Sequence, residues 1–340
     1  MSTWFSPPLG LLFAIIAAAF NPAQAASFCA TSEGSFRTAL NAAAVNGETN
    51  FIRVVAGNYS LGAALGYSSN ATNSLFISGG YAPACSGQTS EPSVLDGQDV
   101  RRPLFIYAPN ANVTVTGFDF VNGLSTNNRG GGLFISGKDV RVDLNRFIGN
   151  RADDYGGGLK VSSSGEMRVR NNAFLANTAA AIGAAELLCN GPFAAVTGNT
   201  VVANTSDTAT YPGGVWIGGS AHFSVSNNIL WNNTTNGAVD LNANTGHERI
   251  DNDIGTSNGT VEDASSAGNL SVNPQFAPCA GFLCFSFVLK RTSPLVDAGE
   301  NAPQGAPALT DLLGGARIVG GRADIGAYEL DVLFANGFGS

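Results

Sequence analysis

Charged residues alternate with apolar ones in two segments of this sequence that occupy equivalent places in successive repeats. They are Asp139, Arg141 and Asp143 in the first segment and Glu166, Arg168 and Arg170 in the second. Alternation puts the charged side chains on one face of a strand, and counterparts on adjacent parallel strands stack about 5 Å apart. A mixed-sign patch of this kind suits a saccharide or calcium site. The interpretation that we favour is a solvated ion network, because exposed ion pairs are common and each contributes little.

Other residues with catalytic potential lack suitable partners in the sequence. Asp153 and Asp154 are adjacent in a loop, so they give no sign of the cleft that two carboxylates must flank to act as acid and base. His222 and His247 have no partner at metal-ligand or triad spacing, and we expect both to be surface histidines. The catalytic residues are therefore unknown, no metal site is predicted, and no cofactor is expected because nothing further supports calcium.

Two aromatic residues, Trp216 and Phe134, are candidates for stacking on sugar rings along an exposed flank. The alternative is that both rings pack against loops.

Glu186 stands where other repeats have an apolar residue: Leu133, Leu159, Val215 and Val239. A residue at this position should point inward, and a lone buried carboxylate needs a partner or has a raised pKa. We favour a slip of one residue that turns Glu186 outward. An inward Glu186 would instead bond asparagine or backbone groups and specify the register.

The elements that must position these residues repeat along the chain. One valine per repeat recurs at a nearly constant spacing: Val115, Val142, Val169, Val196 and Val225. In register with it, the pattern Asn-x-apolar-apolar-x-Asn begins at Asn145, Asn172, Asn199 and Asn228. Markers that keep the same step mean that one supersecondary unit is stacked many times.

Each unit contains three short strands and three turns, which describes one triangular coil of a parallel β-helix. The asparagines then have a structural role, since Asn tolerates left-handed turns and stacked Asn side chains bond along a ladder. A leucine-rich repeat has a similar period but needs a Leu-x-x-Leu-x-Leu frame that is missing. The predicted fold class is all-β: a single-stranded parallel β-helix (solenoid) with a short N-terminal capping helix within residues 32–44.

The N-terminus predicts export. Residues 11–20 are apolar but too short to span a bilayer, and Ala23-Gln24-Ala25 matches a signal-peptidase site. No transmembrane span is expected after processing.

The cysteine content also favours export, because five cysteines fit an oxidising compartment. Cys279 and Cys284 are the best candidates for a pair, the pairing of Cys29 with Cys85 is plausible, and Cys189 is expected to be a buried small hydrophobe.

The expected organisation follows from these patterns. It comprises a signal peptide (1–25), an N-terminal cap (26–50), β-helix coils (51–272), a C-terminal module that closes the helix (273–329) and a tail (330–340).

Several motifs resemble a known family. They are residues 77–81 (Ile-Ser-Gly-Gly-Tyr), 94–97 (Val-Leu-Asp-Gly), the Gly-Gly-Gly-Leu units, 273–276 (Asn-Pro-Gln-Phe), 293–299 (Ser-Pro-Leu-Val-Asp-Ala-Gly) and 324–329 (Asp-Ile-Gly-Ala-Tyr-Glu). With them, residues 50–329 resemble secreted bacterial proteins of the pectate-lyase-like superfold that have polymorphic outer-membrane-protein-type repeats and a choice-of-anchor Q-like C-terminal module. The resemblance implies a right-handed parallel β-helix and export. It does not imply one activity, and the Gly-His-Gly of the superfold's polygalacturonases is missing.

The formal net charge of -8 argues against nucleic acid as a partner and disfavours a broad grip on anionic polysaccharide, although a local basic patch remains compatible with it. We therefore expect a secreted or cell-surface scaffold that binds glycans or another surface without catalysis. The alternative is a polysaccharide lyase or glycoside hydrolase with an unrecognised site near Arg141, Asp143, Arg168 and Arg170. The ligand, the mode of attachment and the oligomeric state do not follow from the sequence.

Overall fold

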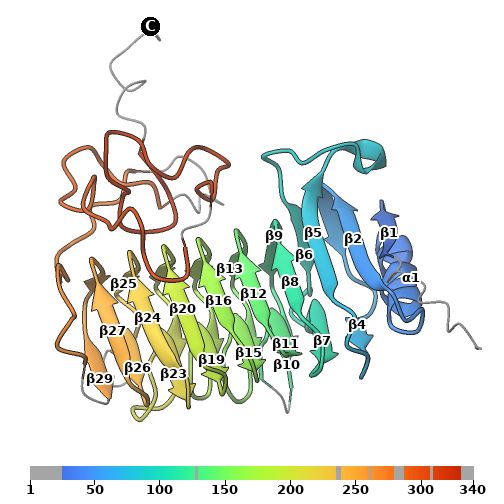
Figure 1. Ribbon diagram of the computed structural model, residues 1–340, viewed down its shortest axis with the longest axis horizontal. Coiled ribbons are helices and arrows are strands. Elements are labelled where there is room, and N and C mark those ends of the chain that lie inside the picture. Colours follow the sequence, from blue (N-terminus) through green and yellow to red (C-terminus); the bar gives the residue numbers. More distant parts are fainter. Residues whose placement is uncertain are drawn as a thin grey trace, which may run out of the picture.

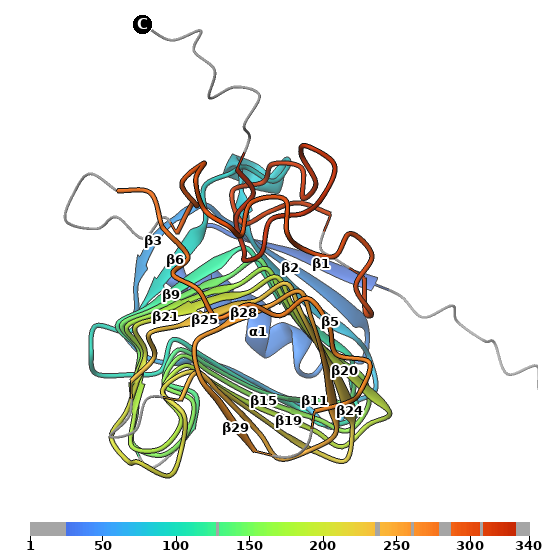
Figure 2. The ribbon, with the colours of Figure 1, turned by 90° about the vertical axis from the view of Figure 1, so that its left-hand side faces the viewer.

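The computed structural model describes residues 25–126, 129–234, 239–259, 262–278, 287–306 and 309–330. Within them the chain winds into a parallel β-solenoid, and seen along its axis the coils enclose a triangular core (Figure 2). The predicted all-β solenoid is confirmed. Three of its sheets form the sides of the triangle, and a fourth, smaller sheet stacks the loops outside it.

Sheet A carries the charged segments, and its strands face the viewer in Figure 1. Its strands are β1 (Ala25–Ala30), β2 (Thr49–Val55), β5 (Leu75–Tyr81), β8 (Val113–Thr116), β12 (Val140–Asp143), β16 (Met167–Arg170), β20 (Phe193–Thr197), β24 (His222–Ser226) and β27 (His247–Ile250). Strand β1 lies within the predicted N-terminal cap and extends the sheet beyond β2.

Sheet B forms the second side. Its strands are β3 (Gly57–Ser60), β6 (Ser93–Asp96), β9 (Phe118–Val121), β13 (Arg146–Ile148), β17 (Ala173–Leu175), β21 (Thr200–Val202), β25 (Ile229–Trp231) and β28 (Asp253–Ile254). Its inward phenylalanines stack from coil to coil, with ring centroids 5.0 Å apart for Phe120 and Phe147 and 4.7 Å apart for Phe147 and Phe174. Such a stack fills the core with the same side chain at the same depth in successive coils.

Sheet C forms the third side. Its strands are β4 (Leu65–Ser68), β7 (Leu104–Ala108), β11 (Leu133–Gly137), β15 (Leu159–Ser163), β19 (Ala185–Cys189), β23 (Val215–Gly219), β26 (Leu241–Ala243) and β29 (Ser257–Gly259). Outside it, the two-residue strands of sheet D, which the sequence did not indicate, are β10 (Leu124–Ser125), β14 (Arg151–Ala152), β18 (Thr178–Ala179) and β22 (Thr205–Ser206).

The register of sheet C corrects the apolar series predicted from the sequence. Ala185 pairs with Leu159, so Ala185 holds the inward position assigned to Glu186. Leu241 pairs with Val215, so it replaces Val239 in the same way. The slip favoured for Glu186 is therefore confirmed, and it places that carboxylate on the outer side of the sheet.

The predicted asparagine ladder is present at the corner between sheets A and B. The Nδ2 of Asn145 donates to the Oδ1 of Asn172 (3.2 Å), and Asn172 donates in the same way to Asn199 (3.0 Å). The ladder continues through Asn228 and two further members, Asn252 and Asn269. Because these amides also satisfy buried backbone groups, they specify the corner of each coil.

The N-terminal end is capped as predicted. Helix α1 (Glu33–Ala43) begins after Ser32, whose side chain accepts a hydrogen bond from the backbone N–H of Ser35. Its apolar face covers the core, with Phe36 and Leu40 fully buried. A solenoid needs such a cover because its first coil would otherwise expose apolar side chains.

The C-terminal module lies along the side of the coils and not across their last turn (Figure 1). The Ala327 N–H donates to the Oγ1 of Thr200 (2.9 Å), and the Gly326 N–H donates to the carbonyl of Asn227 (2.8 Å). Within the module, Arg317 and Glu329 form a buried ion pair (2.6 Å). The module therefore covers the corner between sheets A and B over several coils.

A disulfide joins Cys29 in β1 to Cys85 in the short 3-10 helix η1 (Pro83–Cys85). Cys189 is free and buried, as expected. Cys279 and Cys284 lie outside the described residues, as do residues 1–24 of the predicted signal peptide and the predicted tail from residue 331. None of the helices in the described residues combines the length and the apolar character needed to cross a membrane.

Candidate ligand-binding site

The two charged segments stack as predicted. Arg141 pairs with Arg168 and Asp143 with Arg170 on the adjacent strands β12 and β16. The Oδ1 of Asp139 accepts a hydrogen bond from the backbone N–H of Glu166 (2.8 Å). All six residues therefore lie on the outer side of sheet A.

Only part of this charged patch remains open to solvent. Arg170 donates to both carboxylate oxygens of Asp143 (3.0 and 2.5 Å) and to the carbonyl of Ala306 in the C-terminal module (2.9 Å). Burial raises the pKa of Asp143 above its usual value, against the lowering influence of Arg170. Asp143 and Arg170 thus help to hold the module on the coils, so the expectation of a fully solvated network is wrong for this pair.

The open part surrounds Arg141 and Arg168. A hollow of about 220 Å³ is lined by Asp139, Arg141, Glu166 and Arg168 together with Phe76 and Thr114, among others. Arg168 is paired with Glu166 at 2.8 Å, but the two side chains are 27% and 43% exposed. An ion pair this exposed is weak. Arg141 lies 3.9 Å from Asp143 and is 46% exposed. A ligand anion can therefore compete for either arginine.

The register adds two aromatic residues to this surface. Phe51 pairs with Phe76, and Phe76 pairs with Thr114, which in turn pairs with Arg141. The Phe51 and Phe76 rings stack with centroids 4.8 Å apart, and both are half-buried. We call Phe51, Phe76, Thr114, Arg141 and Arg168 the outer row.

Trp216 and Phe134 lie on a different side, on the outer face of sheet C. Phe134 is half-buried and stacks on Phe105 (5.0 Å), with the guanidinium of Arg102 5.7 Å from both rings. Trp216 is also half-buried and pairs with Glu186. The structure does not bring these rings together with the charged patch, and both pack against neighbours.

Glu186 is outward yet buried. Its Oε1 lies 2.5 Å from the Nζ of Lys160, its neighbour on β15, and the two side chains are 8% and 2% exposed. Arg129 approaches the same oxygen at 3.8 Å and lies over the ring of Tyr155. Burial lowers the pKa of Lys160, although Glu186 opposes the shift. This ion pair lies between sheet C and the loops stacked by sheet D.

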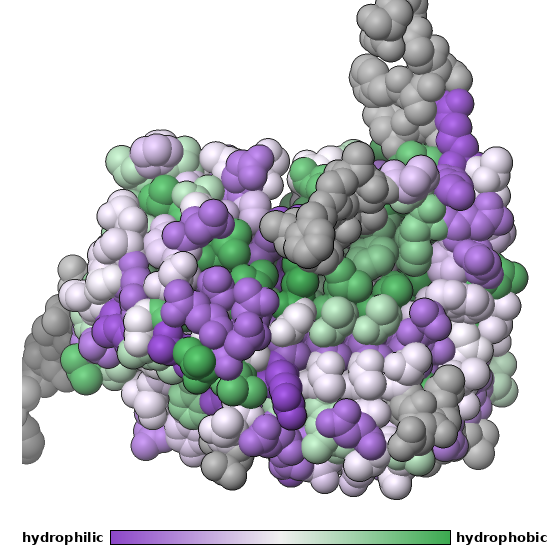
Figure 3. Space-filling view, turned by 180° about the vertical axis from the view of Figure 1, so that it is seen from behind, coloured by the Kyte–Doolittle hydropathy of each residue, from purple (hydrophilic) through white to green (hydrophobic). Residues whose placement is uncertain are grey.

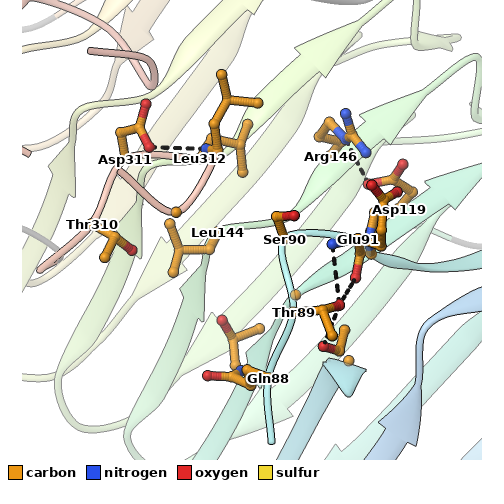
Figure 4. A pocket seen from close by; sticks show the side chains of 17 residues that line it. Gln88, Thr89, Ser90, Glu91, Asp119, Leu144, Arg146, Thr310, Asp311 and Leu312 are labelled. Carbon is orange, nitrogen blue, oxygen red and sulfur yellow. Dashed lines mark hydrogen bonds and ion pairs between the residues drawn. The ribbon is translucent and has the colours of Figure 1, made fainter. Parts of the chain in front are cut away.

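A cleft of about 370 Å³ opens at the corner between sheets A and B, between residues 88–92 and residues 310–314 (Figure 4). Asp119 and Arg146, which are paired neighbours on β9 and β13, form part of its lining (Nε to Oδ1, 2.7 Å). Burial raises the pKa of Asp119, against the lowering influence of Arg146. No sequence pattern indicated this cleft, because its two walls come from opposite ends of the solenoid sequence.

The face of sheet B has a different character. Seen from behind, hydrophobic residues gather over the middle of the molecule (Figure 3). One outward row of sheet B contains Val121, Ile148, Leu175 and Val202, with Trp231 at its end. Trp231 packs against a small core that the module shares with Ile229. We therefore place the polar candidate sites on sheet A and in the cleft.

The histidines differ from the expectation of two surface residues. His222 is exposed, and its Nε2 lies 2.5 Å from the Oδ2 of Asp263. His247 is only 3% exposed, so its predicted surface position is wrong. Burial lowers the pKa of His247.

The adjacent acidic residues Asp153 and Asp154 form no metal site with the other residues that the structure describes. Asp154 instead contacts Arg129 (3.3 Å). In the described part of the chain, no group of three or more His, Cys, Asp or Glu side chains could hold a metal ion.

Residues 102–268 match the family model of the right handed beta helix region. This segment runs from the coil that contains β7 to the turn in which Ala267 bridges Ile250 of β27. The match and the sheet order together define the class of fold as a right-handed parallel β-helix. No curated protein and no solved structure matches the chain.

Proposed function

We propose that this protein is an exported β-helix scaffold that binds a polysaccharide, without catalysis, along the outer row of sheet A. The polysaccharide class that suits the row carries carboxylate or sulfate groups.

The observation that carries the proposal is the continuity of the outer row. Its five residues come from five adjacent parallel strands, so at about 4.8 Å per strand the row is about 19 Å long. A polymer that lies along the solenoid axis meets two stacked aromatic rings, one hydroxyl and two guanidinium groups in succession. Successive sugar residues of a linear glycan can contact successive side chains of this row.

The residue types fit a glycan of this class. The half-buried phenylalanine rings stack on each other, so the pair presents its apolar edges to the C–H groups of a sugar. Guanidinium groups bind carboxylate and sulfate through paired N–H donors. The acidic side chains Asp139 and Glu166 beside the arginines limit the local positive charge. This suits a ligand with spaced anionic groups better than a dense polyanion.

Catalysis near the same residues is the alternative, as a polysaccharide lyase or glycoside hydrolase. Two of its four candidate residues, Asp143 and Arg170, bond each other, and Arg170 also bonds the module, which weighs against their action on a substrate. The arrangement of the charged patch therefore favours binding.

Export is supported by two independent features. The apolar residues 11–20 and the Ala23-Gln24-Ala25 site resemble a signal peptide. The Cys29–Cys85 disulfide is of a kind that persists in oxidising compartments.

The test is a panel of soluble polysaccharides: polygalacturonate, alginate, a sulfated glycan and neutral dextran. Affinity gel electrophoresis should show retardation by at least one anionic polymer and none by dextran. Ultraviolet absorbance of unsaturated products and reducing-end release should both stay at background. Turnover of any polymer would refute the non-catalytic proposal, and failure of every anionic polymer to retard the protein would refute the proposed ligand class.

A further inference from the structure

The cleft between residues 88–92 and 310–314 gathers polar groups that the fold does not use. Arg146 bonds Asp119 through Nε alone, and no described residue bonds its two terminal nitrogens. The other oxygen of Asp119 is likewise without a bonded partner among the described residues. At the rim, the same holds for the hydroxyl of Ser90 and the carboxylate of Glu91, both exposed.

The wall formed by residues 88–92 is held in place by several bonds. The Cys29–Cys85 disulfide ties the preceding turn to β1. The Oγ1 of Thr89 lies 3.1 Å from the carbonyl of Gly80, and the Oγ of Ser93 donates to the carbonyl of Val55 (2.9 Å). A segment bound at both ends presents its rim groups in a fixed position.

The opposite wall is equally fixed. The Oδ1 of Asp311 accepts from the N–H groups of Leu313 (3.0 Å) and Gly315 (2.8 Å). The Leu312 N–H donates to the carbonyl of Ala327 (2.9 Å), and the side chain of Asn171 on the coil donates to the carbonyl of Thr310 (2.8 Å). Two rigid walls around about 370 Å³ of space meet the usual description of a preformed small-molecule site, about 300–1,000 Å³.

The chemistry of the lining selects the ligand. A carboxylate beside a guanidinium offers an acceptor and donors side by side, which matches two neighbouring hydroxyls of a sugar ring. Leu144 and Leu312 provide an apolar surface for the C–H face of such a ring (Figure 4). Glu91, Asp119 and Asp311 outnumber the one cation in the lining, Arg146, so an anionic sugar is repelled.

We propose that this cleft binds an uncharged sugar residue, with Asp119 and Arg146 bonding its hydroxyls. The inference goes beyond the proposed function and does not rest on it, since none of these residues belongs to the outer row.

The test uses the full exported chain and saturation-transfer NMR with glucose, galactose, mannose and N-acetylglucosamine, and with galacturonate as the anionic comparison. The galacturonate comparison is made on an Arg141→Gln, Arg168→Gln variant, in which the outer row has lost its guanidinium groups. We expect a signal from at least one of the four neutral sugars and, in that variant, a signal at least fivefold weaker from galacturonate. No signal from any of the four, or an equal signal from galacturonate in that variant, overturns the proposal.

Two matched variants place the binding in the cleft. Ser90→Trp puts an indole into the cleft from its exposed rim and should weaken binding at least tenfold. Ser86→Trp, on the same loop but outside the cleft, should leave the affinity within twofold.

Two arginine variants distinguish the cleft from the outer row. Arg146→Gln should also weaken binding at least tenfold. If Arg146→Gln does not fold, Ser90→Trp and Ser86→Trp test the proposal in its place. Arg141→Gln should leave neutral-sugar binding unchanged, which separates this site from the outer row. Equal binding by wild type and Ser90→Trp overturns the proposal.

Discussion

Replacement of Glu186 by leucine is expected to destabilise the protein strongly, because it removes the partner of a buried cation. The Lys160 side chain is 2% exposed, and its Nζ lies 2.5 Å from the Glu186 carboxylate. Arg129 is itself cationic and 43% exposed, so it cannot replace the lost carboxylate. The variant leaves an ammonium group between sheets C and D without a counter-charge.

The expected cost follows from the burial of both groups. Removal of one partner of a buried ion pair costs about 3–5 kcal/mol, whereas replacement of both by apolar residues of similar size is near neutral. Glu186→Leu should therefore lose about 3–5 kcal/mol of unfolding free energy, and Lys160→Met with Glu186→Leu should recover most of it. Because burial already lowers the pKa of Lys160, raising the pH should neutralise its amine and reduce the deficit of the single variant.

Urea unfolding of the single and double variants measures these differences, with comparable slopes as the check that the transition is unchanged. Glu166→Leu is the matched control. Its carboxylate is 43% exposed in an ion pair with Arg168, and its loss should cost less than about 1 kcal/mol. A loss of less than about 1 kcal/mol for Glu186→Leu, or a double variant no more stable than the single one, would refute the reasoning.

Three further predictions concern the scaffold. Asn172→Ala should cost about 2–4 kcal/mol in chemical unfolding, because it deprives the buried N–H of the preceding ladder member of its acceptor. Asn269 accepts from the Asn252 N–H in the same way but is exposed, so water can replace it and Asn269→Ala should cost less than about 1 kcal/mol. Equal costs would contradict the ladder argument. Replacement of Cys29 and Cys85 by serine should lower the unfolding free energy by about 4 kcal/mol, since the disulfide closes a loop across a sequence separation of 56 residues. An unchanged Tm would contradict a stabilising role of the disulfide. Burial raises the pKa of Asp253 to about 6 from its usual 3.8, so the folded state holds this proton more tightly than the unfolded state and stability should fall as pH rises from about 4 to about 6. Asp253→Asn should flatten the pH profile of the unfolding free energy by at most about 3 kcal/mol, and an unaltered profile would exclude this residue as the cause.

The charged patch was predictable because two periods agree. Alternation fixes which side chains of a strand face outward, and the regular step of the repeat fixes which residues become neighbours. These two periods are sufficient to predict that Arg141 pairs with Arg168. Phe51 and Phe76 were missed as members of the same row, since the first coils have unequal lengths and the coil from Phe76 to Thr114 is longer than the repeat.

The remaining parts of the candidate sites depend on contacts that leave no local pattern. Strands of two residues, as in sheet D, are too short to show a period, so the burial of the outward Glu186 had no signal. The contact of Arg170 with Ala306 joins residues 136 positions apart, as the module folds back along the coils. In both cases tertiary packing covers a surface that local alternation predicts to be open.

The central claim is that the outer row binds an anionic polysaccharide, and the most direct measurement is the affinity of an Arg141→Gln, Arg168→Gln double variant. Isothermal titration with the best anionic polymer of the panel compares it with wild type and with an Arg151→Gln variant. The control arginine is also exposed but lies on β14 of sheet D.

Two exposed charge-assisted contacts at about 1 kcal/mol each predict an affinity loss of about 30-fold, with weaker binding at higher salt. The control should bind as wild type does. An unchanged affinity in a folded double variant, or an equal loss in the control, would contradict the account.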